Sequence, residues 1–243
     1  VTFAAGLAVS RMLPVFAVYS SFLQRGYDQI IHDAAISRTH IVLGIDRAGI
    51  VGEDGETHQG LFDVPMLTCI PNITVYSPSD YDELRLCLRK ALYDTPSVAA
   101  VRYPRGAQSN VKMKLDENNM FCFEGHGSKN LAIGYGRTGG TVCEVVRAGG
   151  LDTDVLKLVK IFPIESGVID LCMKYDKIII FEEALQNGSI GEHLTAALTA
   201  KGYKGDISIN AIHGFVKQAK TESALKKFSL DKAGIEKKIS DFI

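Results

Sequence analysis

Short apolar runs alternate with segments of helical periodicity along almost the whole chain, and no other feature restricts the possible folds as much. The predicted strands cover residues 15–19, 40–46, 73–77, 97–103, 131–134, 155–161, 177–181 and 207–212. The predicted helices cover residues 1–12, 22–37, 64–70, 81–93, 138–148, 166–175 and 189–201, and helical segments follow residue 221. This alternation predicts an α/β chain with doubly wound, mostly parallel sheets and right-handed crossovers.

A polar stretch interrupts the alternation near the middle of the chain. Residues 108–123 read QSNVKMKLDENNMFCF and show neither helical nor strand periodicity. Polar segments of this kind often connect domains. The sequence therefore predicts a first domain over residues 1–108, a linker over 109–123 and a second domain over 124–243, each domain with its own doubly wound sheet.

The composition excludes several classes of partner. The chain has 243 residues, of which 46% are apolar and 23% charged, and its net charge is −1. This charge gives no bulk electrostatic case for binding nucleic acid or an anionic membrane. No apolar run is long enough to span a membrane, and no signal peptide is visible. The five cysteines form no C-x-x-C and predict reduced thiols in the cytoplasm, and no cluster has metal-ligand spacing, so no metal is expected on this chain.

Residues 46–60 read DRAGIVGEDGETHQG and follow a predicted buried strand. The stretch holds four glycines and six ionisable side chains. Glycine allows sharp turns and close backbone approach, and ligands of α/β sheets bind outside the carboxyl ends of strands. The stretch therefore predicts a polar site, although charge and glycine alone would also fit a solvated surface loop.

The order of the residues in this stretch resembles a known family. The pattern DRAGIVGxDGxTHQG, with VYSSFLQRGYDQIIHD at 18–33 and VRYPRG at 101–106, is similar to the pyrimidine-binding domain of the 1-deoxy-D-xylulose-5-phosphate synthases. These enzymes belong to the transketolase-like thiamine-diphosphate family. The resemblance implies a pyrimidine-binding domain, truncated at its N-terminus, over 1–108 and a transketolase C-terminal domain over 124–243. It also implies condensation of pyruvate with D-glyceraldehyde 3-phosphate, with release of CO₂.

The resemblance implies a role for seven side chains. Asp54 and His58 are expected to face the substrate as catalytic groups, and histidine suits proton transfer at neutral pH. Phe22 is expected to stack on the aminopyrimidine ring of thiamine diphosphate, with Tyr19 and Arg25 nearby. The last two residues, Arg47 and Arg105, are expected to bind the substrate phosphate, because guanidinium groups match phosphate oxygens. The alternatives are a solvated histidine, core aromatics and ordinary surface ion pairs.

Two parts of the family's machinery are not found in these 243 residues. In the family, a catalytic Glu lies just upstream of the stretch that matches Val1-Thr-Phe-Ala-Ala-Gly, and a GDG…N fingerprint holds Mg²⁺ and the diphosphate. We therefore expect a partner, the missing N-terminal half of the same protein, that binds Mg²⁺. The chain alone is expected to be inactive, and the family resemblance implies a homodimer. The family's product feeds isoprenoid, thiamine and pyridoxal synthesis.

Two other functions fit parts of the sequence. The chain could be the β subunit of a 2-oxo acid dehydrogenase or of a split transketolase. It could also be a non-catalytic α/β module that binds a nucleotide or a partner. The basis for the last alternative is Gly134-Tyr-Gly-Arg-Thr-Gly139, a G-x-G-x-x-G between a predicted strand and a predicted helix, with Asp152 and Asp154 downstream. A tight strand-to-helix turn would give the same pattern.

Overall fold

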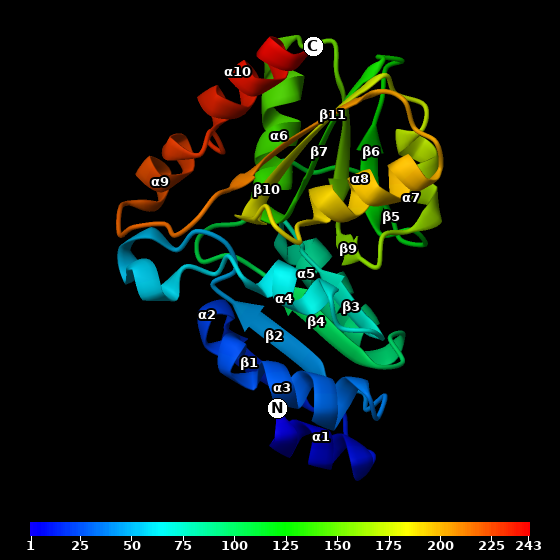
Figure 1. Cartoon of the computed structure of the whole chain (residues 1–243), viewed down its shortest axis with the longest axis vertical. Helices are drawn as coiled ribbons and strands as arrows, with labels where there is room; N and C mark the ends of the chain where they lie inside the picture. Colours follow the sequence, from blue (N-terminus) through cyan, green and yellow to red (C-terminus); the bar gives the residue numbers. More distant parts are fainter.

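The computed structural model describes all residues, 1–243, and shows two α/β units stacked end to end (Figure 1). A five-stranded sheet has the order β1-β2-β4-β3-β9, and a six-stranded sheet has the order β11-β10-β7-β8-β6-β5. Most neighbouring strands are parallel, and helices lie between them in the sequence. The predicted fold class, α/β with two mostly parallel sheets, is confirmed.

The first unit is built around four parallel strands, which are β1 (Val15–Tyr19), β2 (Val42–Asp46), β3 (Ile73–Tyr76) and β4 (Val98–Arg102). Its helical segments are α1 (Thr2–Val9), α2 (Ser20–Leu23), η1 (Gln24–Gly26), α3 (Tyr27–Gln29), the π-helical η2 (Ile30–Ala35), α4 (Asp63–Thr68) and α5 (Tyr81–Tyr93). Side chains of β2 and β4 alternate between two apolar clusters, so helices cover both faces of this sheet. Continuous apolar runs are typical of strands buried on both faces.

The N-terminal cap of α5 shows how local sequence places an element. The Asp80 side chain accepts hydrogen bonds from the backbone N–H groups of Asp82 and Glu83, at 2.9 and 3.0 Å. The Glu83 carboxylate reaches back to the Ser79 N–H at 2.8 Å. Asp80 is therefore the N-cap of α5, and Glu83 also holds the residue before the cap.

The second unit holds strands β5 (Leu115–Asp116), β6 (Phe121–Glu124), β7 (Asn130–Tyr135), β8 (Asp154–Leu158), β10 (Lys177–Leu185) and β11 (Asp206–Ile212). Its helices are α6 (Gly136–Gly149), α7 (Ser166–Cys172), α8 (Ile190–Ala200), α9 (Thr221–Lys227) and α10 (Lys232–Phe242). Alternate residues of β7 and β10 enter two different clusters, one with α7 and α8 and one with α6 and α10. The sheet is therefore covered on both faces, as Figure 1 shows.

Two predictions about the middle of the chain are wrong. The stretch expected to lack strands contains β5 and β6, which form an antiparallel hairpin against β8. Met120 and Cys122 of this stretch are buried. The polar residues around them hide the apolar pattern of a strand in the sequence. The predicted strand 155–161 is two strands, because after β8 the chain crosses to the first sheet as β9 (Lys160–Phe162), antiparallel to β3. The second half of the chain thereby completes the first sheet.

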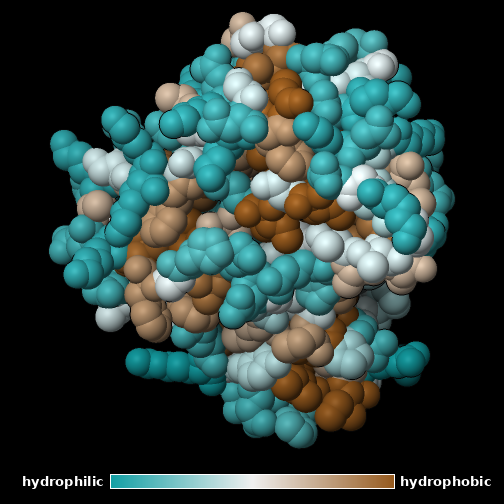
Figure 2. All heavy atoms as spheres, turned by 45° about the horizontal axis from the view of Figure 1, so that its top comes forward, coloured by the Kyte–Doolittle hydropathy of each residue, from teal (hydrophilic) through white to brown (hydrophobic).

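The largest apolar cluster has 30 buried residues and draws on both sheets. Figure 2 shows a mostly polar surface broken by separate apolar patches. Phe3, Val9 and Met12 of the N-terminal segment are among the exposed apolar side chains, at 80, 75 and 57% exposure. No helix has the length and apolar character needed to cross a membrane.

Candidate active site

The candidate site lies where β1, β2 and β4 end. β1 and β2 are parallel neighbours, and their last residues, Tyr19 and Asp46, are paired in register. The chain after β4 is held at the same edge, because the Ala48 N–H donates to the Tyr103 carbonyl at 3.0 Å. Parallel topology therefore brings together three segments that are far apart in the sequence.

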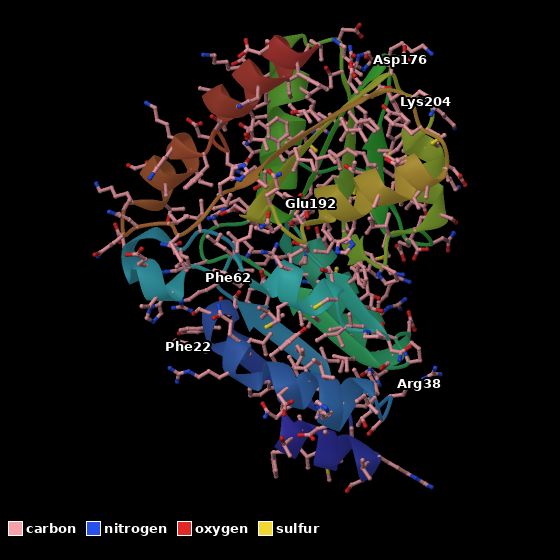
Figure 3. All side chains as sticks on the ribbon, viewed as in Figure 1. Phe22, Arg38, Phe62, Asp176, Glu192 and Lys204 are labelled. Atoms are coloured by element: carbon pink, nitrogen blue, oxygen red, sulfur yellow. The ribbon has the colours of Figure 1, made fainter.

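An aromatic cluster forms one side of the site. The rings of Tyr19 and Phe22 are stacked with centroids 5.5 Å apart, and the His58 ring meets Phe22 edge-on at 5.2 Å. The Arg47 guanidinium lies 3.8 Å above the Tyr19 ring, a cation–π contact. Phe22 remains 43% exposed and projects from α2 toward solvent (Figure 3). Beside it, the buried hydroxyls of Ser20 and Ser21 have no hydrogen-bond partner.

Charged groups form the other side. The Asp54 carboxylate accepts a hydrogen bond from Arg47 Nε at 3.1 Å and is also paired with Arg105 Nη1. Arg47 Nη1 also pairs with Asp46 Oδ2 at 2.7 Å. Burial works to raise the pKa of Asp54, but the hydrogen bonds and charges of the two arginines outweigh it, and that pKa is lowered. Asp54 is therefore a carboxylate that two guanidinium groups hold in place.

The loop that carries Asp54 and His58, residues 49–60 and here called the site loop, has a closed neck. Gly49 and Gly60 exchange two backbone hydrogen bonds of 2.7 and 2.8 Å. Gly49 has a φ of +84°, which favours glycine. A Cβ on Gly60 would overlap the Arg47 carbonyl oxygen and lie 2.9 Å from Ser20 Cβ. The Gln59 side chain adds a bond from the Val51 N–H at 3.0 Å, so the loop is tied across its base.

The structure brings six of the seven predicted site residues into one connected cluster, namely Tyr19, Phe22, Arg47, Asp54, His58 and Arg105. Arg25 is exposed on η1 and makes no ion pair or ring contact with the cluster. Their functional roles stay predictions.

Sequence reasoning missed two ion pairs behind the site, one fully buried and one partly buried. Arg102 Nε donates to Asp63 Oδ2 at 2.8 Å, and Arg137 of α6 pairs with Glu183 of β10. Arg137 lies within the G-x-G-x-x-G motif, and Glu183 lies at the end of an apolar run, where a charge is unusual. An acidic residue directly after an apolar strand is the only feature of the sequence that indicates the second pair.

The glycines of the G-x-G-x-x-G motif are explained by close packing. Gly134 and Gly139 lie so close that a Cβ on Gly134 would be 2.8 Å from Gly139 Cα. Gly136 has a φ of +56°, and a Cβ there would be 2.8 Å from Ser77 Oγ of the first unit. The turn therefore serves helix–strand packing and contact between the units. No group of three or more His, Cys, Asp or Glu side chains could hold a metal ion.

Comparison with known proteins finds similarity over the first unit and over the whole chain. Residues 1–109 match the family described as transketolase, pyrimidine binding domain. Over its whole length the chain is 37% identical to the 1-deoxy-D-xylulose-5-phosphate synthase of Chlorobaculum tepidum and 36% identical to that of Pasteurella multocida. The chain spans 40% of the length of each of these relatives. The family resemblance predicted from the three motifs is confirmed.

Solved structures share the fold. A split-gene transketolase, described as an "inactive beta4 tetramer", superposes with a TM-score of 0.83 at 16% identity. The superposition covers 99% of this chain and 79% of the transketolase chain. The transketolase of Campylobacter jejuni superposes with a TM-score of 0.75 at 17% identity, covering 95% of this chain and 36% of its own. The transketolase fold therefore extends through both α/β units.

Proposed function

We propose that this chain forms the pyrimidine-binding and C-terminal portions of a thiamine-diphosphate-dependent transferase. The proposed reaction condenses pyruvate with D-glyceraldehyde 3-phosphate to 1-deoxy-D-xylulose 5-phosphate and releases CO₂. The observation that carries the proposal is the convergence of Arg47 and Arg105 on one carboxylate beside the exposed Phe22–His58 edge. The similarity to synthases of this name over the whole chain supports the choice of substrates.

The aromatic side of the site fits the cofactor's pyrimidine ring. Phe22 exposes a ring on which a flat heteroaromatic could stack, and the unpartnered Ser20 and Ser21 hydroxyls lie beside it. Tyr19 supports Phe22 from behind, and Arg25 is proposed to line the approach. When bound, thiamine diphosphate supplies the nucleophilic carbon and electron sink that decarboxylation of a 2-oxo acid requires.

The charged side of the site fits a phosphate. Arg47 and Arg105 already face a shared anion, the Asp54 carboxylate, so a substrate phosphate would find both guanidinium groups oriented. His58 Nδ1 is 3.0 Å from Thr57 Oγ1, whereas Nε2 makes no hydrogen bond. We assign to Nε2 the proton exchange with the aldehyde oxygen, and to Asp54 the orientation of the substrate.

Other groups that the proposed reaction needs would come from outside these 243 residues. A further portion of the same protein would bind the diphosphate and Mg²⁺ and supply the catalytic Glu, and the assembly would be a homodimer in the cytoplasm. Without that portion, the chain is proposed to be inactive. The product would serve isoprenoid, thiamine and pyridoxal synthesis.

A fusion enzyme tests this function. The chain replaces the matching 40% of the Chlorobaculum tepidum relative, and formation of product and CO₂ is measured. We expect turnover, and we expect Arg47→Ala with Arg105→Ala to raise KM for glyceraldehyde 3-phosphate far more than KM for pyruvate. An inactive but folded fusion, or equal effects on both substrates, would refute the assignment.

A second candidate is the β-type subunit of a split transketolase. Its support is the superposition on the split-gene transketolase, which covers nearly all of this chain. In that case a fusion or a complex would transfer two-carbon units from ketose phosphates instead of using pyruvate. Measuring both donors in one assay distinguishes the two candidates.

A further inference from the structure

One ion pair of the second unit holds both backbone groups of a single residue in the site loop. The Ile50 N–H donates to Glu183 Oε1 at 2.8 Å, and Arg137 Nη2 donates to the Ile50 carbonyl at 2.9 Å. Arg137 Nε donates to Glu183 Oε2 at 3.1 Å, so the two side chains and the backbone of Ile50 form a closed ring of hydrogen bonds. Charge-assisted bonds of this kind are among the strongest in proteins.

The same pair reaches both substrate arginines through the backbone. Ile50 follows Arg47 by three residues and lies at the neck of the site loop. Arg137 Nη1 is 3.4 Å from the carbonyl oxygen of Arg105. A Cβ on Gly49 would lie 2.9 Å from Glu183 Oε1 and would displace this carboxylate.

The position of the Arg137–Glu183 pair in the second sheet explains how it reaches the neck of the site loop. β7 and β10 are neighbours from which the chain continues in opposite directions along the sheet, and the ends of these strands form the crevice where open α/β sheets bind ligands. Arg137 is the second residue of α6, the helix after β7, and Glu183 lies near the end of β10. In this chain, the neck of the site loop fills that crevice. Ile50 is fully buried there with Leu61, Phe181 and Ile212.

We propose that Arg137 and Glu183 are positioning residues that fix the site loop, and through it Arg47 and Arg105, for substrate phosphate. The inference about the loop rests on the contacts above, and its link to substrate rests on the proposed function. Neither residue touches the substrate in this proposal. Their removal should loosen the loop without removing any group that binds or reacts.

Amide hydrogen exchange of the full chain tests the positioning directly. In Arg137→Met we expect the Ile50 amide and the rest of the site loop to exchange about tenfold faster, because the hydrogen bond to the Ile50 carbonyl is lost and Glu183, the acceptor of the Ile50 N–H, loses its charged partner. Glu183→Gln keeps an acceptor for the Ile50 N–H but loses the charge, so a smaller increase is expected. This milder variant serves if Arg137→Met fails to fold.

The matched control is Lys157→Met. Lys157 is 1% exposed and pairs with Glu83 at 2.5 Å, which also joins the two units, but it makes no contact with the site loop. We expect Lys157→Met to leave exchange of the site loop unchanged while it lowers overall stability. Equal acceleration of the loop in Lys157→Met and in the Arg137 and Glu183 variants would overturn the proposal.

Kinetics of the fusion enzyme separate this inference from the proposed function. If the fusion is active, Arg137→Met should raise KM for glyceraldehyde 3-phosphate about tenfold and leave KM for pyruvate within twofold, which a general loss of stability would not do. An unchanged KM for the phosphate substrate would overturn the link to Arg47 and Arg105. An inactive parent fusion with a loosened loop in the variant would refute the proposed function and leave the loop's positioning supported.

Discussion

Replacement of Arg102 by methionine tests how much a buried charge pair contributes beneath the site. Arg102 and Asp63 have side chains that are 5 and 0% exposed, joined at 2.8 Å (Nε to Oδ2) and 3.3 Å (Nη2 to Oδ1). Burial opposes the charge on Arg102, but the Asp63 carboxylate outweighs it and raises the pKa of the guanidinium. Without Arg102, the Asp63 carboxylate keeps only the Val64 N–H, at 3.0 Å.

The expected loss follows from that uncompensated carboxylate. Breaking a buried ion pair on one side costs about 3–5 kcal/mol, so we expect Arg102→Met to lower the free energy of unfolding by about 4 kcal/mol. Urea denaturation followed by far-ultraviolet circular dichroism measures the change. Adding Asp63→Asn in the same chain should recover part of the loss, because the buried charge is then removed.

The control is a solvent-exposed ion pair. Lys232 and Glu144 have side chains that are 65 and 45% exposed, and Lys232→Met should cost less than about 1 kcal/mol. If Arg102→Met costs no more than Lys232→Met, the buried pair contributes nothing beyond an ordinary surface contact. The reasoning about charge at the base of the site would then be wrong.

Three further predictions follow from the site and the core. The ion pairs of Asp54 contribute fully above its unfolded-state pKa, and because its folded pKa is lowered, this contribution is lost as the pH falls below about 4. The protection factors of the site-loop amides, which correct each exchange rate for its intrinsic pH dependence, should therefore fall in that range, and protection factors that stay constant would contradict this. Gly60→Ala should lower the free energy of unfolding by about 1–3 kcal/mol, because the new Cβ overlaps the Arg47 carbonyl oxygen. The control Gly6→Ala has open space around it and should not destabilise the fold, and similar unfolding midpoints for the two variants would disprove the packing account. Ellman's reagent should modify only the exposed Cys69 in the native chain, because the other thiols are buried and burial raises the pKa of Cys122 to about 12. A second fast-reacting thiol would contradict this prediction.

Much of the fold and most of the site cluster could be predicted because their signals are local. β1 and α5 have the predicted bounds, since each is a short segment whose apolar periodicity matches its structure. Arg47, Asp54 and His58 share one loop, so their proximity follows from the sequence itself. Arg105 joins them because the carboxyl ends of parallel strands meet at one edge of the sheet.

The features that could not be predicted depend on contacts between distant residues. β9 pairs with β3 across more than eighty residues, and no local pattern distinguishes it from a continuation of β8. The hydrogen bond from Ile50 to Glu183 spans 133 residues. Arg25 lies one helical turn beyond Phe22, and this proximity in the sequence does not bring it into the charged cluster.

The interface between the two units explains why the site needs the second one. A loop with four glycines gains little from packing: Gln59 ties its base, and Asp54 and His58 contact groups outside the loop. Ordering such a loop costs about 1–2 kcal/mol of conformational entropy per residue, which its few apolar contacts do not offset. The buried Ile50 and the Arg137–Glu183 pair supply fixed points outside the loop, at the neck from which Asp54 and His58 project. The second unit therefore acts on the site through the backbone of the first, and its charged residues are conformational supports without being part of the chemistry.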